Sequence, residues 1–144
     1  MKKKLTKLQA YNAMVSFLDA YYDKNKSENL SDFITYAFFW FDGKTADPEA
    51  WPEWKETLQA MSKRDKNFKN LNRLTHLQAL HAMVNFFKLY CSLYVQVPLD
   101  MIIVLKMLES LQDNRASDPA WSDWIKSIED TVVKKDPRVY IQKA

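Results

Sequence analysis

Residues 5–21 read LTKLQAYNAMVSFLDAY, and residues 74–90 repeat this pattern as LTHLQALHAMVNFFKLY. The repetition continues downstream, where DGKTADPEAWPEW at residues 42–54 returns as DNRASDPAWSDW at residues 113–124. An internal repeat decides the architecture, because each copy forms the same local structure and the copies pack together. The chain is therefore expected to be two copies of one helical unit.

Each copy begins with the pattern of a helix N-terminus. Thr6 and Gln9 have the spacing of a capping box, in which the hydroxyl and the amide side chain each accept a backbone N–H. Thr75 and Gln78 repeat this spacing. Apolar residues then recur every three or four positions, which predicts an amphipathic helix in both copies.

A second helix is expected at about residues 30–41. Ser27 and Asn29 are the alternative N-caps, because both side chains carry an oxygen that accepts an amide hydrogen bond. Gly43 is the only glycine of the chain and suits the left-handed residue that closes a helix. Asn114 occupies the matching position in the second copy and is the next best residue for that conformation.

The third helix follows an Asp-Pro pair in both copies. Residues 47–51 are expected to form a tight turn, with the helix running from Pro52 to about residue 61. A helix starting at Pro48 would place Pro52 at its fifth position, where a proline loses a backbone hydrogen bond. The matching helix of the second copy is expected at about residues 122–133.

These elements predict an all-α fold, in which two tandem pseudo-repeats of about three helices each pack as one helical bundle. The expected boundaries are residues 5–62 and 74–133 for the repeats, 63–73 for a surface linker and 134–144 for a short tail. At 144 residues with 47% apolar content, the chain suits one domain with a substantial core. One glycine and five prolines are too few for a many-stranded protein or a Gly-rich phosphate loop.

Paired tryptophans mark the third helix of each copy. Trp51 and Trp54, like Trp121 and Trp124, are three residues apart and lie on one helical face. We expect these rings to be buried where the third helix crosses the first, because large aromatic side chains dominate core energetics. A role in stacking on a base or a cofactor is the alternative.

Few residues could carry catalysis. His76 and His81 do not share a helical face, and Cys91 has no evident base beside it. Zinc requires three or four convergent ligands, which the sequence does not offer. We therefore expect that the protein is not an enzyme and that it needs no cofactor or metal.

Localisation follows from the same composition. A single cysteine excludes a disulfide framework and favours a reducing compartment. The basic N-terminus is followed by an amphipathic helix, which argues against a signal peptide. No 18-residue apolar stretch is present, so a membrane partner is not expected. The expectation is a soluble cytoplasmic protein.

The order LTxxxAxxAMxxFLxxYY followed by DGxxADPxxWxxW resembles small helical proteins encoded beside bacterial polymorphic toxins, among them immunity proteins of contact-dependent growth inhibition systems. The matching residues are Ala10, Ala13, Met14, Phe17, Leu18, Tyr21, Tyr22, Asp42, Gly43, Ala46, Asp47, Pro48, Trp51 and Trp54. The second copy departs from the pattern at Asn114 and has one residue fewer before Trp121. The resemblance implies binding of a cognate toxin domain, often a nuclease, whose active site is blocked; it transfers no contact residue, since immunity surfaces vary with the toxin.

Positions where the copies differ in polarity are candidates for partner contact. Alignment of the second helices pairs Phe33 with Val104 and Ala37 with Leu108 as a shared core face. Beyond it the first copy is aromatic where the second is polar. These aromatic residues are Phe38, Phe39 and Phe41, opposite Glu109, Ser110 and Gln112. Aromatic side chains are enriched in interface cores, but packing between the units and homodimerisation are open alternatives.

Acidic residues gather around both Asp-Pro pairs, although the net charge is +3. The candidates for toxin contact are Asp42, Asp47, Glu49 and Glu53 in the first copy and Asp113, Asp118 and Asp123 in the second. An acidic surface attracts a basic nuclease by long-range steering. The alternative is an ordinary solvated edge, since acids are favoured at helix starts. Nucleic-acid binding is disfavoured, because the basic segments form no continuous basic helix or known binding motif.

The sequence thus favours an immunity protein that neutralises a toxin domain by masking its active site. A non-enzymatic helical scaffold or adaptor, which self-associates or binds another cytoplasmic protein, is the alternative. A homo-oligomer is possible but not indicated.

Overall fold

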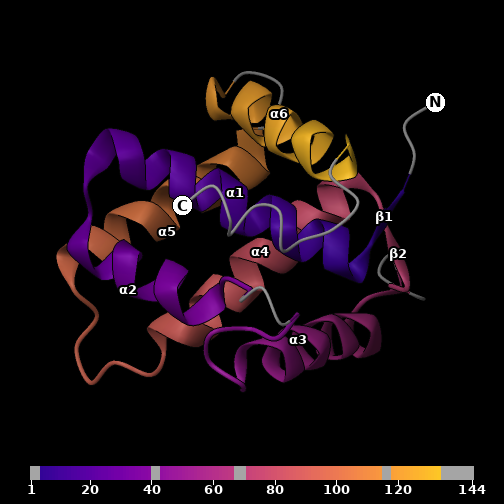
Figure 1. Ribbon diagram of the computed structural model, residues 1–144, viewed down its shortest axis with the longest axis horizontal. Helices are drawn as coiled ribbons and strands as arrows, with labels where there is room; N and C mark the ends of the chain where they lie inside the picture. Colours follow the sequence, from indigo (N-terminus) through magenta and orange to yellow (C-terminus); the bar gives the residue numbers. More distant parts are fainter. Residues whose placement is uncertain (1–3, 40–42, 67–70, 115–117, 134–144) are drawn as a thin grey trace.

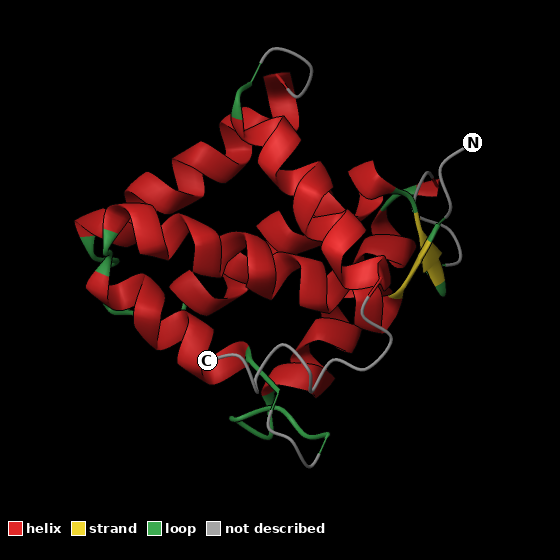
Figure 2. Cartoon of the chain, turned by 45° about the horizontal axis from the view of Figure 1, so that its top comes forward, coloured by secondary structure: helices red, strands yellow, loops and turns green. Residues whose placement is uncertain are grey.

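The computed structural model describes residues 4–39, 43–66, 71–114 and 118–133, and in these ranges the chain is mostly helical, with one short strand pair (Figures 1 and 2). The elements are β1 (Leu5–Thr6), α1 (Lys7–Asn25), α2 (Glu28–Ala37), α3 (Ala50–Arg64), β2 (Arg73–Leu74), α4 (His76–Cys91), α5 (Leu99–Asn114) and α6 (Ala120–Val133). The all-α prediction is confirmed. No helix within these ranges has both the length and the apolar character that a membrane crossing requires. We call β1 to α3 the first half and β2 to α6 the second half.

Both capping boxes are present. The Thr6 hydroxyl accepts the Gln9 amide at 3.0 Å, and the Gln9 side chain accepts the Thr6 amide at 2.9 Å. Thr75 and Gln78 form the same two bonds at the same distances. These bonds satisfy amides that the first turn of a helix leaves without a partner.

Helix α2 begins after the expected cap Ser27, but it ends at Ala37 rather than at residue 41. Phe38 adopts an extended conformation, and its carbonyl accepts the Ala46 amide at 2.8 Å, so the chain folds back on itself. Gly43 has a positive φ of 86° inside this loop. The prediction that Gly43 closes the helix is therefore wrong, although the left-handed conformation expected of it is present.

Helix α3 starts at Ala50, two residues before the expected Pro52. The Asp47 side chain accepts the Glu49 amide at 2.9 Å and forms the tight turn that precedes the helix. Pro52 is consequently the third helical residue, where the amide has no intrahelical partner and a proline costs little. In the second half α6 likewise begins early, at Ala120.

One strand pair was not expected. Leu5 lies opposite Leu74 and Thr6 opposite Arg73 in an antiparallel arrangement (Figure 2). Leu5, Leu74 and the nearby Leu71 are buried, so the end of the expected surface linker is part of the core. A two-residue strand leaves no alternating pattern in the sequence, which is why the pattern did not reveal it.

The inner tryptophan of each pair is fully buried, as expected. The Trp54 indole N–H donates to the Lys7 carbonyl at 3.1 Å, and that of Trp124 donates to the His76 carbonyl at 3.2 Å. Lys7 and His76 are the first residues of α1 and α4, so both bonds tie a third helix to the start of the first helix in its own half. The outer tryptophans, Trp51 and Trp121, are only partly buried.

The third helices nevertheless pack along the first helices of the opposite halves. Helix α6 lies mainly on α1, and α3 lies on α4 (Figure 1). The Trp124 ring meets Phe17 of α1 edge-on at 5.7 Å, and Trp54 meets Phe86 of α4 edge-on at 5.5 Å. The Trp54 ring also meets Tyr11 of α1 edge-on at 5.5 Å, so it is buried between the third helix and a first helix, as expected. The longer helix contacts, however, join the two halves. Corresponding residues make matching contacts in the two halves, while the superposition of the complete halves stays a prediction.

A carboxylate joins α5 to the start of α2. Asp100 accepts hydrogen bonds from the Ser27 hydroxyl at 2.7 Å and from the Asn29 amide and side chain at 3.1 and 2.9 Å. Burial raises the pKa of Asp100, but these hydrogen bonds outweigh it, so the pKa lies below its usual value of 3.8.

Asp100 is expected to stabilise the protein at neutral pH and to lose this effect in acid. Because the folded-state pKa is lowered, the stabilisation is present above the unfolded-state pKa and disappears as the pH falls through the folded-state pKa. Asp100→Ala is therefore expected to unfold at lower urea concentration than the parent at neutral pH, with a smaller difference below the pKa. Urea unfolding at neutral pH and at pH values below the folded-state pKa of Asp100 measures the effect. A difference that does not depend on pH would show that the charge of Asp100 is irrelevant.

Candidate functional site

Three acidic residues of the first half lie at the start of α3, and one of them binds the hydroxyl of Tyr36 near the end of α2. The Tyr36 hydroxyl donates to the Glu53 carboxylate at 2.9 Å. Asp47 forms the turn before α3, and Glu49 is exposed beside it. We call Asp47, Glu49 and Glu53 the acidic cluster.

The electrostatics of Tyr36 show that these carboxylates act together. Burial raises the pKa of Tyr36, the hydrogen bond to Glu53 raises it further, and the charges of Glu53, Asp47 and Glu49 add to the shift. Each carboxylate disfavours a negative charge at the same oxygen. Direct contacts place two of these residues beside Tyr36, because Glu53 accepts from its hydroxyl and the Asp47 amide donates to its carbonyl at 3.2 Å. The Tyr36 hydroxyl stays protonated at neutral pH and holds Glu53 in place as a hydrogen-bond donor.

The phenylalanines next to the acidic cluster differ in how deeply they are buried. Phe39 is only 6% exposed, and its ring lies 5.4 Å from Tyr11 and 6.0 Å from Trp51. Phe39 therefore follows the packing alternative, because the turn after Ala37 folds its ring into the core. Phe38 is half-buried against the core. Phe41 and Asp42 lie outside the described residues.

The acids of the second half occupy a different setting. Asp118 and Asp123 line a groove of about 560 Å³ between α1 and α6. Lys24 and Lys126 line it too, and the Lys24 ammonium lies 3.9 Å from the Asp123 carboxylate. Asp113 is exposed near the end of α5 and is not among the groove residues. Lysines therefore compensate part of the negative charge of this groove.

The two Asp-Pro aspartates share a structural task. Asp118 accepts the Ala120 amide at 2.9 Å, just as Asp47 accepts the Glu49 amide at the same distance. Each side chain shapes the turn before its helix, which is typical of aspartate in this position. Glu49 and Glu53 are therefore the better candidates for partner contact, since no backbone turn depends on their side chains.

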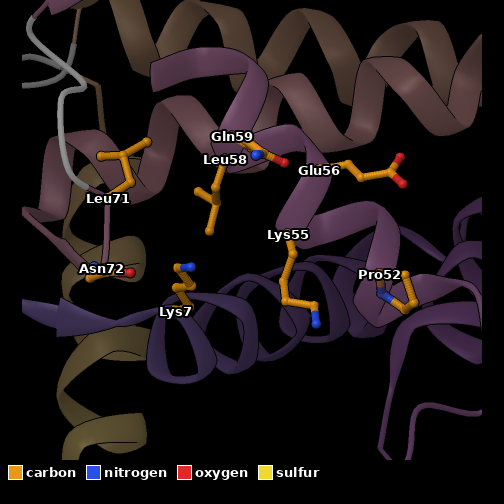
Figure 3. A pocket seen from close by; sticks show the side chains of 8 residues that line it. All are labelled: Lys7, Pro52, Lys55, Glu56, Leu58, Gln59, Leu71 and Asn72. Carbon is orange, nitrogen blue, oxygen red and sulfur yellow. The ribbon is translucent and has the colours of Figure 1, made fainter. Parts of the chain in front are cut away.

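A second hollow of about 550 Å³ lies where α3 faces the start of α1 (Figure 3). Leu58 and Leu71 supply its apolar wall, and Lys7, Lys55 and Glu56 supply charges of both signs. Its volume is within the range of small-molecule pockets, about 300–1,000 Å³. The residues that line it include no histidine or cysteine, and its mixed charges select no ligand class.

Cys91 is a core residue at the end of α4. Burial raises the pKa of its thiol to about 11, so the reactive thiolate is scarce at neutral pH. Within the described ranges no group of three histidine, cysteine or acidic residues is arranged to hold a metal ion.

Replacing Cys91, His76 or His81 by alanine is expected to leave protection against the proposed toxin partner unchanged. The first copy has no histidine or cysteine at the matching positions, and the Cys91 thiol is protonated. Survival of toxin-expressing cells measures this, with thermal unfolding as the control for folding. A tenfold loss of protection in a folded variant would indicate that one of these side chains acts chemically.

Comparison with models of protein families, with curated proteins and with solved structures finds no match for this chain. The assignment of function therefore depends on its own surfaces. One surface that the sequence analysis missed is a set of exposed aliphatic side chains around the connection from α4 to α5.

Proposed function

We propose that the protein is an immunity protein that binds a cognate bacterial toxin domain and masks its active site. The toxin is a nuclease of a contact-dependent growth inhibition system in this proposal. The observation that carries it is the acidic cluster, in which Asp47, Glu49 and Glu53 converge on one region at the start of α3.

A nuclease is the toxin class that such a surface suits. Nucleases bind a polyanion, and their substrate sites are lined with lysine and arginine that neutralise phosphates. Carboxylates on a rigid helix start can occupy the same positive surface, and their field increases the rate of encounter. The hydrogen bond from Tyr36 fixes the Glu53 carboxylate before binding, which reduces the entropy lost when the complex forms. The resemblance to immunity proteins supports the same proposal.

Co-expression tests this function. A toxin domain encoded beside this protein is produced in cells with and without it, and growth and nucleic-acid integrity are measured. The expected result is growth and intact nucleic acid only when both proteins are present, together with a stable complex on purification. Absence of both protection and binding would contradict the proposal.

A helical scaffold or adaptor is the second candidate. The exposed aliphatic side chains near the connection from α4 to α5 favour it, because soluble monomers rarely expose contiguous apolar surface without a binding function. The two candidates differ in their partner: an immunity protein protects against one toxin, whereas a scaffold associates without any effect on toxicity.

A further inference from the structure

Four aliphatic side chains are exposed at the end of the molecule where α4 leads into α5. They are Leu93 (68% exposed), Val95 (109%), Leu99 (72%) and Ile103 (52%). Leu99 and Ile103 are one helical turn apart on α5, while Leu93 and Val95 lie in the connection that runs along the outside of the molecule (Figure 1). We call these four residues the apolar end.

The fold does not require aliphatic residues there. The first half carries a charged residue at every matching position, with the connections aligned through α1 and α4 and the helices aligned through buried Phe33 and Val104. These charged residues are Lys24, Lys26, Glu28 and Asp32. Packing therefore does not explain the apolar end, which points to an intermolecular contact.

A groove of about 780 Å³ adjoins the apolar end. Leu99, Ile103 and Tyr21 contribute apolar walls. Lys26, which closes α1, contributes a positive charge, and Glu28 and Asp100 contribute negative charges, although the Asp100 carboxylate is already held by Ser27 and Asn29. The apolar end thus offers both projecting aliphatic side chains and a groove that could receive such side chains from a facing surface.

The charges decide between possible occupants. An anionic membrane prefers a rim of one positive sign, and a strongly charged protein prefers a rim of the opposite sign, but Lys26 and Glu28 present both signs next to each other. A second copy related by a two-fold axis can place Lys26 of each copy opposite Glu28 of the other, since such an interface uses the same surface twice. The apolar residues are few compared with the roughly 20–30 residues a side of a standard interface, which is typical of a weak, reversible dimer.

We propose that the apolar end is the interface of a reversible homodimer. Leu93 and Val95 of one copy face the groove at Leu99 and Ile103 of the other. The groove lies at the N-terminal end of α2, whereas Glu53 of the acidic cluster binds Tyr36 near the C-terminal end of that helix. This proposal does not depend on the toxin-binding function.

Sedimentation equilibrium of the full chain tests the dimer. The parent is expected to shift with increasing concentration from a mass of 17.0 kDa towards twice that value. Leu99→Glu combined with Ile103→Asp introduces the residue types that the first half carries at Glu28 and Asp32, and it is expected to weaken dimerisation at least tenfold. Val132→Glu changes an exposed aliphatic residue on α6 and serves as the matched control with unchanged dimerisation. Circular dichroism verifies the folding of each variant.

Charge reversal then identifies the partner as a second copy in the proposed orientation. Lys26→Glu and Glu28→Lys are each expected to weaken the dimer, and the double reversal is expected to restore it. A parent that stays at 17.0 kDa at every concentration overturns the proposal. The proposal is also overturned if the dimer persists in the variant with Leu99→Glu and Ile103→Asp. The same holds if the double charge reversal dimerises no more strongly than either single reversal.

Discussion

Replacing Trp54 or Trp124 by alanine is expected to lower the free energy of unfolding by about 3–5 kcal/mol. Both indoles are fully buried, and each donates a hydrogen bond to the first residue of a helix in its own half while packing on a phenylalanine of the other half. The substitution therefore leaves a cavity and removes a hydrogen bond at the junction of the halves. Urea unfolding monitored by circular dichroism measures the loss, which is a large part of a typical stability of about 5–15 kcal/mol.

The outer tryptophans provide the matched control. Trp51 and Trp121 lie one helical turn before the buried pair and are only partly covered, so Trp51→Ala and Trp121→Ala are expected to cost clearly less. Equal losses at inner and outer positions would contradict the contacts that tie the halves together. Similar losses for Trp54→Ala and Trp124→Ala would support the correspondence of the two halves.

Local patterns predicted the starts of α1 and α4. The capping boxes at Thr6 and Thr75 depend on residues three positions apart, and such short-range hydrogen bonds do not need the rest of the fold. The end of α2 was not predictable in this way. The chain leaves the helix after Ala37 because the Phe38 carbonyl finds the Ala46 amide and because Phe39 finds a place in the core, and neither contact is visible in helical periodicity.

The packing of the helices could not be predicted from the internal repeat. The periodic pattern showed that Trp54 and Trp124 belong to a core face, but it could not show that their helices lie on the opposite halves. That exchange depends on how the aromatic rings of α1, α3, α4 and α6 interlock in three dimensions, as with Phe17 against Trp124. The strand pairing of Leu5 with Leu74 is a further contact between the two halves and is equally invisible to periodicity.

The candidate surfaces were partly predictable. The acidic residues could be found by composition, whereas the hydrogen bond between the Tyr36 hydroxyl and Glu53 could not, because the two residues are on different helices. The apolar end could have been found from the sequence. Comparing Leu93 and Val95 with Lys24 and Lys26 shows a reversal of polarity that the alignment of the second helices alone did not cover.

Removing charge from the acidic cluster is expected to slow association with the toxin domain at least tenfold at low salt. The variant combines Glu49→Lys with Glu53→Gln, because glutamine keeps an acceptor for the Tyr36 hydroxyl and Asp47 continues to shape the turn. Long-range attraction between opposite charges increases the association rate, and salt screens it. The difference from the parent is therefore expected to shrink as salt is added, and stopped-flow binding at several ionic strengths measures it.

Asp113→Lys is the control, because Asp113 is an exposed acid near the end of α5 in the other half. It reproduces the charge change of Glu49→Lys, which is two of the three charge units of the combined variant, so an effect of net charge alone appears in both proteins. We expect the control to bind at close to the parental rate, since electrostatic steering depends on the potential at the contact surface. If both variants slow binding equally, the toxin responds to net charge only. If neither changes the rate or its salt dependence, the acidic cluster is not the contact surface, and the basic residues Lys63 to Arg73 become the next candidates.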